Sequence, residues 1–358
     1  MRASGLLLGR CGMAKVWVTG FQPFGKHTEN ISGDIARSLI GQSFDVEIES
    51  SLPFDVTEKM IEIQYGGEVL SVDEKGSVRT SEILRDELPD AIIHLGLKED
   101  SVKINLELCA INECDFRIKD NAGRQLKNTP VIESALPLLH TTSHAPTLRQ
   151  IAAKYADVEI SEDCGKFVCN ETYFRTLNSI ERDVLLIDGR PIPALFIHLP
   201  HPEQISIVRQ KEVINELSVY LVQKPTVQVV GAIAISDDNR ILACRRSPTE
   251  VMGGLWEFPG GKVEFGETEQ SALKRELKEE LELNVEIGKC LARESHDYGS
   301  MIVNLAFYEC KVNAAGINLS VHDSYRWLDE DESGDLEWLP ADVGVVGQLA
   351  EKGFGNLG

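Results

Sequence analysis

Short apolar runs alternate with helix-like stretches along the first two thirds of the chain. The apolar runs are rich in isoleucine, leucine and valine and occupy residues 14–20, 90–97, 183–189 and 194–200. Stretches typical of helices lie between them, at 32–41, 78–88 and 205–222. Strands that alternate with helices predict an α/β domain with a mainly parallel sheet. In such sheets, functional sites gather at the carboxyl ends of the strands.

The pattern changes at Pro225, which cannot continue the helix predicted just before it. Beyond Pro225, the apolar runs 227–236 and 241–246 flank an Asp-Asp-Asn sequence, which predicts a hairpin. A glycine-rich loop, one strong helix and a strand at 301–312 follow. We therefore expect two domains, at 13–222 and 226–358. Residues 1–12 are expected to be a loose extension or to precede the true start of the protein.

The composition narrows the classes of partner. The chain has 358 residues, 42 % of them hydrophobic, and a formal net charge of −21. No apolar run approaches the ~20 residues that a membrane-spanning helix needs. We therefore expect no membrane as partner. Because the negative charge repels DNA and RNA backbones, we also expect no nucleic acid polymer as partner. Free nucleotides are repelled as well, so phosphate chemistry would require a divalent metal ion.

A helix rich in carboxylates is predicted in the second domain. From Glu267 to Leu283 the chain has no proline or glycine, and strong helix formers dominate. Glu276, Glu279 and Glu280 are spaced so that their carboxylates share one strip of the helix surface. This strip is either a solvated acidic face, balanced by neighbouring basic residues, or the set of oxygen ligands that Mg²⁺ or Mn²⁺ prefers.

The same segment carries a long and specific motif. Gly261, Glu267 and the sequence Arg275-Glu276-Leu277-x-Glu279-Glu280 have the spacing of the Nudix box, which this segment resembles. The flanking sequences GGLWEFPGGKVE and EWLPADVGVV resemble the MutT-type subgroup, which hydrolyses nucleoside triphosphates to a monophosphate and pyrophosphate. The resemblance covers 226–358 and implies an α/β/α sandwich with a mixed sheet. Glu282 stands where the family usually has glycine, so we expect an altered helix exit.

The resemblance to Nudix enzymes also implies roles for individual residues. Arg275 would orient the carboxylates through an ion pair, and Glu279 would also take part in catalysis. The implied ligands of Mg²⁺ or Mn²⁺ are Glu276, Glu279, Glu280 and Glu267. The residues implied at the nucleotide are Arg246, Phe258 and Asp342. The substrate stays open between an oxidised nucleotide, such as 8-oxo-dGTP, and a cytidine nucleotide.

A candidate nucleophile lies in the first domain, in the sequence KFVCNETYF at 166–174. Cys169 precedes a predicted helix, and the positive end of a helix favours the reactive thiolate. The partner base that a thiol needs could be His198, which follows an apolar run at the carboxyl end of a predicted strand. Both residues have the simpler alternative of a structural role. The eight cysteines include no CxxC pair, which favours a reducing, cytoplasmic location without disulfides.

Four sequence blocks, in order, resemble pyroglutamyl peptidase I, a cysteine peptidase. The blocks are GFQPFG at 20–25, ELCAINECDFRIKDNAG at 107–123, CGKFVCN at 164–170 and FIHLPHPEQ at 196–204. The resemblance spans 14–220 and implies an α/β/α domain. It also implies Cys169 as the nucleophile and His198 as the general base. Glu107 is implied as the residue that orients the base, and Arg117 as a group near the developing oxyanion. The residues implied to line a pocket for the flat pyroglutamyl ring are Phe21, Phe24, Ile118 and Val168, for which ordinary core packing is the alternative.

The chain departs from this family in loops near the pocket. Leu97 replaces a glutamine near the polar edge of the ring, Ile31 replaces a proline, and Cys164 stands where alanine is common. The HLPHPEQ segment is one residue shorter than usual, which makes His201 an alternative to His198. These changes affect the expected substrate specificity more than the expected nucleophile chemistry.

We therefore expect a bifunctional hydrolase that acts on a nucleoside triphosphate and on pyroglutamyl peptides. In one alternative, the Nudix enzyme is active and the peptidase-like domain is a binding or oligomerisation module. In another, the Nudix domain is a nucleotide sensor that controls the peptidase, although the intact acidic motif argues against this. Relatives of the first domain form tetramers, so a homo-oligomer could form through it.

Overall fold

The chain folds into two compact units. The computed structural model describes residues 12–25, 28–49, 58–312 and 316–354. The division between the units falls between Pro225 and Thr226. Apart from Gly12, the extension expected over residues 1–12 lies outside the described residues. Within the described ranges, no helix is both long enough and apolar enough to cross a membrane.

The first unit is built on a seven-stranded sheet. Its strands are β1 (Met13–Phe21), β2 (Ser43–Glu49), β3 (Glu58–Leu70), β4 (Ala91–Leu97), β5 (Ile104–Glu107), β8 (Val158–Ser161) and β11 (Ala194–Leu199). Their order across the sheet is β2-β3-β1-β4-β11-β5-β8. β1 runs parallel to β3 and β4, and β4 runs parallel to β11. The carboxyl ends of β1, β4 and β11 therefore meet at one edge, as the α/β pattern predicted.

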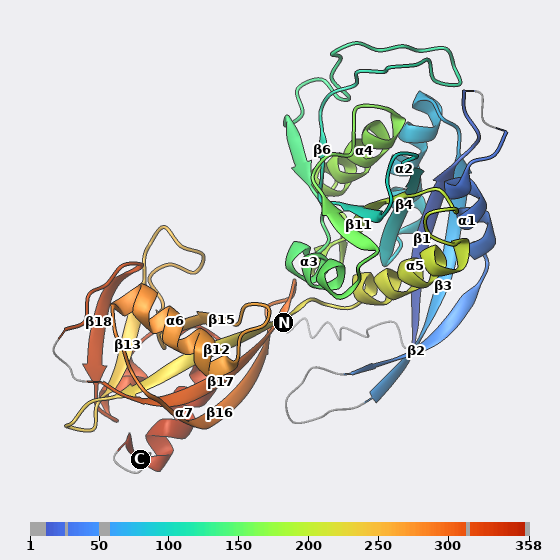
Figure 1. The fold of residues 1–358 in the computed structure, drawn as a ribbon. Helices are drawn as coiled ribbons and strands as arrows, with labels where there is room; N and C mark the ends of the chain where they lie inside the picture. The colour runs from blue at the N-terminus through green and yellow to red at the C-terminus, as the bar shows by residue number, and fades with distance from the viewer. Residues whose placement is uncertain (1–11, 26–27, 50–57, 313–315, 355–358) are drawn as a thin grey trace, which may run out of the picture. The chain divides into compact units, whose positions relative to one another are not determined.

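Helices cover both faces of this sheet (Figure 1). Apolar residues of α1 (Ile31–Leu39), α3 (Ala145–Lys154) and α5 (Ile207–Val222) are buried against one face. Those of α2 (Glu74–Glu87) and α4 (Val168–Arg182) are buried against the other. β5 runs antiparallel to β11 and parallel to β8, so the sheet is mainly, but not wholly, parallel. This is the three-layer α/β/α arrangement that the sequence predicted.

The apolar run at 183–189 is not a strand of this sheet, so that prediction was wrong. Only β9 (Leu186–Ile187) forms there, and it pairs with β10 (Arg190–Pro191). Val184 and Asp188 have left-handed backbones, with φ of 49° and 50°. These two turns prevent a continuous extended run, and the segment instead connects α4 to β11. A second small sheet joins β6 (Cys109–Ile111) to β7 (Leu138–His140).

The second unit has a mixed sheet between two helices (Figure 1). The strands are β12 (Thr226–Ile235), β13 (Ile241–Arg246), β14 (Trp256–Glu257), β15 (Gly260–Lys262), β16 (Ile287–Asp297), β17 (Ile302–Lys311) and β18 (His322–Leu328). β12 runs parallel to β17 and antiparallel to β13 and β15. α6 (Glu269–Leu281) and α7 (Val343–Lys352) pack in separate apolar clusters, and a short 3₁₀ helix spans Glu332–Asp335.

Helix α6 forms where the sequence predicted a carboxylate-rich helix. The hydroxyl of Thr268 accepts a hydrogen bond from the backbone of Ser271, which caps the first turn. Leu273, Leu277 and Leu281 are completely buried and attach the helix to the sheet. The helix ends at Glu282, whose backbone is left-handed with φ of 55°. A glycine would adopt this conformation without strain, so Glu282 forms the exit at some energetic cost.

Candidate active sites

The first candidate site lies at the start of helix α4. The first turn holds Cys169, where unpaired backbone N–H groups give the helix its positive end. Phe167 precedes the helix with an extended backbone and provides no side-chain cap. Cys169 is partly exposed and lines a pocket. Cys169 packs partly against the apolar core, but it is not fully buried, so a reagent in the pocket could reach its thiol.

A hydrogen-bond chain connects this thiol to a buried carboxylate. His198 lies near the end of β11, and its Nδ1 is 2.7 Å from Oε1 of Glu107. His198 is also hydrogen-bonded to Cys169. Burial disfavours the charged imidazole, but the bonds to Cys169 and Glu107 outweigh it and raise the pKa of His198 to about 9. The imidazole therefore holds its proton at neutral pH, beside the thiol that must lose one.

The pocket beside Cys169 has a volume of about 580 Å³. Phe21 ends β1 and Leu97 ends β4, so the strand ends themselves supply part of its wall. The other apolar residues of the wall are Phe24, Val72, Phe167 and Val168. Polar lining comes from Asn30, Lys98, Glu99, Asp100 and Arg117. Mostly apolar walls beside a thiol suit an acyl group with a flat, uncharged ring.

The second candidate site surrounds Arg275 on helix α6. Its Nε and Nη2 donate to the two carboxylate oxygens of Glu267, each at 2.9 Å. Its Nη1 donates to Glu276 at 2.8 Å and to Glu279 at 3.4 Å. The guanidinium thus holds three of the predicted acidic residues together, which is the orienting contact that the motif implied for Arg275.

The residues around α6 fit a hard divalent cation in their chemistry. Burial, with smaller contributions from Glu257 and Glu276, raises the pKa of Glu280 to about 7. A Cβ on Gly261 would lie 2.3 Å from the carboxyl carbon of Glu276, so the glycine leaves room for that carboxylate. Within the described ranges, no three acidic, histidine or cysteine side chains already converge on one metal position. The donors are nevertheless carboxylate oxygens, and a cation would relieve the repulsion among them.

A second pocket, of about 590 Å³, lies in the same unit. It is lined by all three residues that the sequence placed at the nucleotide, Arg246, Phe258 and Asp342. Burial, and then the charge of Glu257, raises the pKa of Asp342 to about 8. At neutral pH this carboxyl group is therefore mostly protonated and can donate a hydrogen bond. Arg246 donates to Glu257 at 3.0 Å, which holds the guanidinium at the pocket.

Comparisons with known proteins assign both units. A family model described as pyroglutamyl peptidase matches residues 14–235, and one described as NUDIX domain matches residues 230–346. A pyrrolidone-carboxylate peptidase from Pyrococcus furiosus is 27 % identical over 225 residues, which cover 62 % of this chain and 99 % of the relative. A CTP pyrophosphohydrolase from Escherichia coli is 32 % identical over 120 residues, which cover 34 % of this chain and 88 % of the relative.

The chain belongs to both families. Each is a family of hydrolases, so the chain carries two hydrolase domains. The solved structure of a pyrrolidone carboxyl peptidase from Thermococcus litoralis is 25 % identical, with a TM-score of 0.48, and covers 59 % of this chain and 93 % of that one. Membership of the Nudix family implies a divalent metal ion in general.

The pyroglutamyl peptidase unit brings most of its predicted site residues together. Cys169, Arg117 and His198 line one pocket, and Glu107 lies behind His198. Phe21, Phe24 and Val168 line the same pocket. Ile118 is not among the described residues that line it, and 41 % of its surface is exposed. His201, the alternative base, is also exposed and lies 3.8 Å from Glu203.

Sequence reasoning missed several residues that the sites contain, among them Phe167 and Glu257. Phe167 lines the peptidase pocket, with its ring 5.9 Å from that of Phe24. Its place directly before Val168, inside a matched sequence block, was a usable signal. In the Nudix unit, Glu257 lines the nucleotide pocket and accepts hydrogen bonds from Arg246 and His322, each at 3.0 Å. It directly precedes Phe258 in the flanking motif, which could have indicated it.

Proposed function

We propose that the chain is a bifunctional hydrolase whose first unit removes N-terminal pyroglutamate from peptides. The observation that carries this proposal is the hydrogen-bonded series Cys169, His198 and Glu107 at the edge of a mostly apolar pocket. Three groups in this order are what a thiol needs to act as a nucleophile with an oriented base.

The proposed peptidase reaction is acyl transfer. The Cys169 thiolate attacks the carbonyl of the pyroglutamyl residue, and a thioester forms as the peptide amine leaves. The His198 imidazolium gives its proton to that amine, then takes one from the water that hydrolyses the thioester, which releases 5-oxoproline. Glu107 holds the imidazole in orientation throughout. Backbone N–H groups at the start of α4, with Arg117, would stabilise the oxyanion.

A chromogenic pyroglutamyl amide tests this half of the proposal. We expect turnover by the full chain that Cys169→Ala abolishes. Glu203→Gln is a matched control, since this carboxylate is exposed and outside the pocket lining. If the wild-type chain shows no turnover that depends on Cys169, the peptidase unit is a binding or oligomerisation module.

We further propose that the second unit is a metal-dependent nucleoside triphosphate pyrophosphohydrolase. Support comes from the carboxylates held around Arg275 and from the separate pocket that contains Arg246, Phe258 and Asp342. Mg²⁺ or Mn²⁺ would be held by Glu276, Glu279, Glu280 and Glu267, and would supply charge neutralisation at the phosphates and an activated water. The base would pack beside Phe258, with the protonated Asp342 as donor to one of its acceptor atoms.

The nucleotide is best identified with a panel of substrates. We expect metal-dependent release of pyrophosphate from an oxidised nucleotide such as 8-oxo-dGTP or from a cytidine triphosphate, and the relative from Escherichia coli supports the cytidine arm. Glu279→Gln should abolish that release without changing peptidase turnover. Equal, metal-independent rates on every nucleotide would contradict the proposal. We also propose a reducing cytoplasm as the location of the protein, because the proposed peptidase reaction needs Cys169 as a free thiol.

A further inference from the structure

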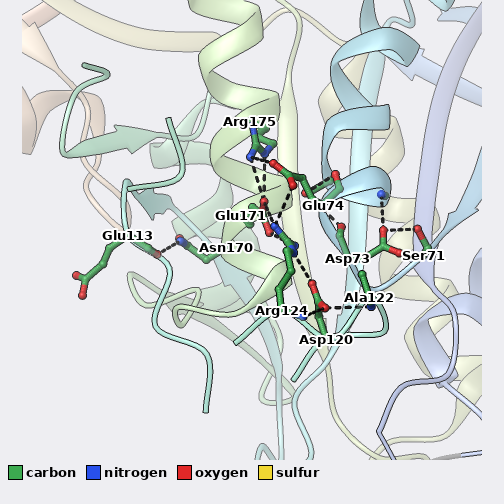
Figure 2. Close-up of polar contacts among 12 residues, drawn as sticks. Ser71, Asp73, Glu74, Glu113, Asp120, Ala122, Arg124, Asn170, Glu171 and Arg175 are labelled. Atoms are coloured by element: carbon green, nitrogen blue, oxygen red, sulfur yellow. Dashed lines mark hydrogen bonds and ion pairs between the residues drawn. The ribbon is translucent and has the colours of Figure 1, made fainter. Parts of the chain in front are cut away.

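The two residues that follow the nucleophile are buried polar side chains that the peptidase reaction does not use. Asn170 is 0 % exposed and Glu171 is 1 % exposed. Buried polar groups persist in proteins when they are fully paired, and the pairing shows what each one holds. Both side chains hold the same stretch of chain, the segment from 111 to 124 (Figure 2).

Asn170 fixes the beginning of this segment. Its Oδ1 accepts the backbone N–H of Ile111 at 2.9 Å, and its Nδ2 donates to the carbonyls of Ile111 and Glu113 at 2.8 and 3.0 Å. The backbone N–H of Asp115 then donates to the carbonyl of Lys166, just before α4. The beginning of the segment therefore moves with the first turn of the helix that carries Cys169.

Glu171 fixes the end of the segment through a bidentate ion pair. Nη2 of Arg124 lies 2.9 Å from one carboxylate oxygen of Glu171, and Nη1 lies 3.3 Å from the other. Arg175, one helical turn further along α4, donates to the same carboxylate at 3.1 Å. Figure 2 shows Glu171 between the two guanidinium groups, and the carboxylate of Glu74 lies 3.7 Å from Nη1 of Arg124 and 3.6 Å from Nη2 of Arg175. Such planar, paired contacts fix the orientation of the two side chains as well as the distance between them.

Arg124 also fixes the conformation of the loop 120–124. Its Nε donates to the buried Asp120 at 2.6 Å, and the other oxygen of Asp120 accepts the backbone N–H groups of Ala122 and Arg124. The loop 120–124 is thus folded around one carboxylate and tied to α4 by one arginine. Two buried carboxylates, those of Glu171 and Asp120, face the two guanidinium groups, and the more exposed carboxylate of Glu74 is ion-paired with both of them as well.

The segment 111–124 supplies part of the peptidase pocket. Arg117 lines the pocket directly. The ring of Phe116 lies 4.8 Å from that of Phe167, which is a pocket wall residue, at an angle of 70°. The backbone N–H of Asn121 donates to the carbonyl of Val72, another wall residue. A displacement of this segment would move the oxyanion-side arginine and two walls of the pocket together.

We infer that Glu171 is a positioning residue of the peptidase: through Arg124 it holds the segment 115–124, and with it Arg117, against the substrate pocket. Glu171 does not touch the substrate, and the inference rests on the peptidase function proposed above. The same helical turn therefore carries the nucleophile and the support for the part of the pocket wall that contains Arg117.

Glu171→Gln tests the inference, because it keeps the shape of the side chain and removes the charge that pairs with both arginines. We expect kcat/KM for a pyroglutamyl amide to fall by about 10- to 100-fold, because displacing groups from their productive positions slows a reaction by factors of this size. The rate at which iodoacetamide alkylates Cys169 should not fall, because the thiol and His198 are untouched. Glu181→Gln, on the exposed far end of the same helix, is the matched control and should change neither quantity. An unchanged kcat/KM, or a parallel loss of alkylation, would overturn the inference.

Arg124→Gln provides a second variant, because it removes the guanidinium that joins Glu171 to Asp120. Glu171→Gln and Arg124→Gln should each cause a similar loss, and the double variant should lose little more than either one. Additive losses would show that the two residues act separately and would contradict a shared support.

Amide hydrogen exchange separates this inference from the proposed activity. In Glu171→Gln, residues 115–124 should exchange at least about tenfold faster, while β4 stays as protected as in the wild type. Unchanged exchange in the loop overturns the positioning role, even if activity falls. If the wild-type chain has no pyroglutamyl peptidase activity, the proposed function fails, and faster exchange in the variant still shows that Glu171 holds the segment.

Discussion

Single side chains set the protonation of the peptidase site, and this gives a pH prediction. The hydrogen bonds to Cys169 and Glu107 raise the pKa of His198 to about 9 despite its burial. A raised pKa means that the imidazolium is complete below the ordinary value of 6.5 and is lost as the pH rises through about 9. We therefore expect kcat/KM for a pyroglutamyl amide to fall above about pH 9, where the leaving amine loses its proton donor.

Removing one of these hydrogen bonds should change the pH at which kcat/KM falls. Glu107→Gln takes away a charge that favours the imidazolium, so the alkaline fall should shift to lower pH. The rate near pH 7 should drop by about 10²- to 10⁴-fold, because the imidazole also loses its orientation. Profiles of kcat/KM against pH for both proteins check this, with Glu203→Gln as control. A fall at the same pH in Glu107→Gln would mean that Glu107 does not control the proton on His198.

Leu97 should limit how well the pocket binds a pyroglutamyl ring. The ring has a polar edge, and the leucine at the end of β4 can pair with none of its groups. A hydrogen bond is worth about 0.5–1.5 kcal/mol net, so Leu97→Gln should raise kcat/KM by roughly 2- to 10-fold. Steady-state kinetics on the same amide measure this, with Leu136→Gln, an exposed leucine, for comparison. A lower kcat/KM in Leu97→Gln would indicate that the pocket prefers a less polar acyl group.

The sequence indicated the residues of the Cys169–His198–Glu107 series better than the residues that support them. Cys169, His198 and Glu107 lie in blocks whose spacing is informative without a structure. The pairing of Arg124 with Glu171 joins residues 47 positions apart, and neither residue belongs to a periodic pattern. Such a contact depends on where the loop packs, so it could not be derived from local sequence.

Secondary-structure elements were predictable where one periodicity dominated. Helix α6 has a stripe of buried leucines and a capping threonine, and both are visible in the sequence. The run at 183–189 is equally apolar in composition, yet Val184 is 67 % exposed because the backbone turns there. Composition alone does not reveal a left-handed residue that is not glycine. The strand order could not be predicted from the sequence either, because it depends on pairings between distant segments.

The contact between strand β15 and helix α6 gives a further prediction. A Cβ on Gly261 would lie 2.3 Å from the carboxyl carbon of Glu276. The end of that side chain can swing aside, so Gly261→Ala should change the melting temperature little. The displaced carboxylate would leave the proposed metal site, so Mn²⁺ affinity and metal-dependent pyrophosphate release should both fall by at least about tenfold. Calorimetric Mn²⁺ titration and a pyrophosphate assay measure these two quantities.

Gly347→Ala is the matched control for this substitution. Gly347 lies in helix α7, and a Cβ there would meet nothing within 4 Å. Alanine is favoured over glycine within a helix by about 1 kcal/mol, so this variant should be as stable or more stable, with unchanged activity. If Gly261→Ala keeps full Mn²⁺ affinity, Glu276 is not a metal ligand.

The chain joins two hydrolase units, and among the described residues neither candidate site contains a residue of the other unit. The peptidase residues lie in the unit that ends at Pro225, and the carboxylates of α6 lie in the unit that follows. The described residues that line each pocket all belong to one unit. The two chemistries also differ in their needs, since one uses a thiol and an imidazole and the other uses carboxylates and a metal ion. We therefore propose that 13–222 and 226–358 are independent domains.

Independent domains predict that each activity can be removed without the other. In the full chain, Cys169→Ala should abolish release of 5-oxoproline and leave pyrophosphate release within about twofold, because no residue of the metal site is changed. Glu280→Gln should do the reverse, since its isosteric amide is a poorer ligand for a hard cation. Saturating nucleotide with Mg²⁺ should leave the peptidase rate of the wild type unchanged. A peptidase rate that rises or falls with nucleotide, and that loses this response in Glu280→Gln, would instead make the Nudix domain a sensor that controls the peptidase.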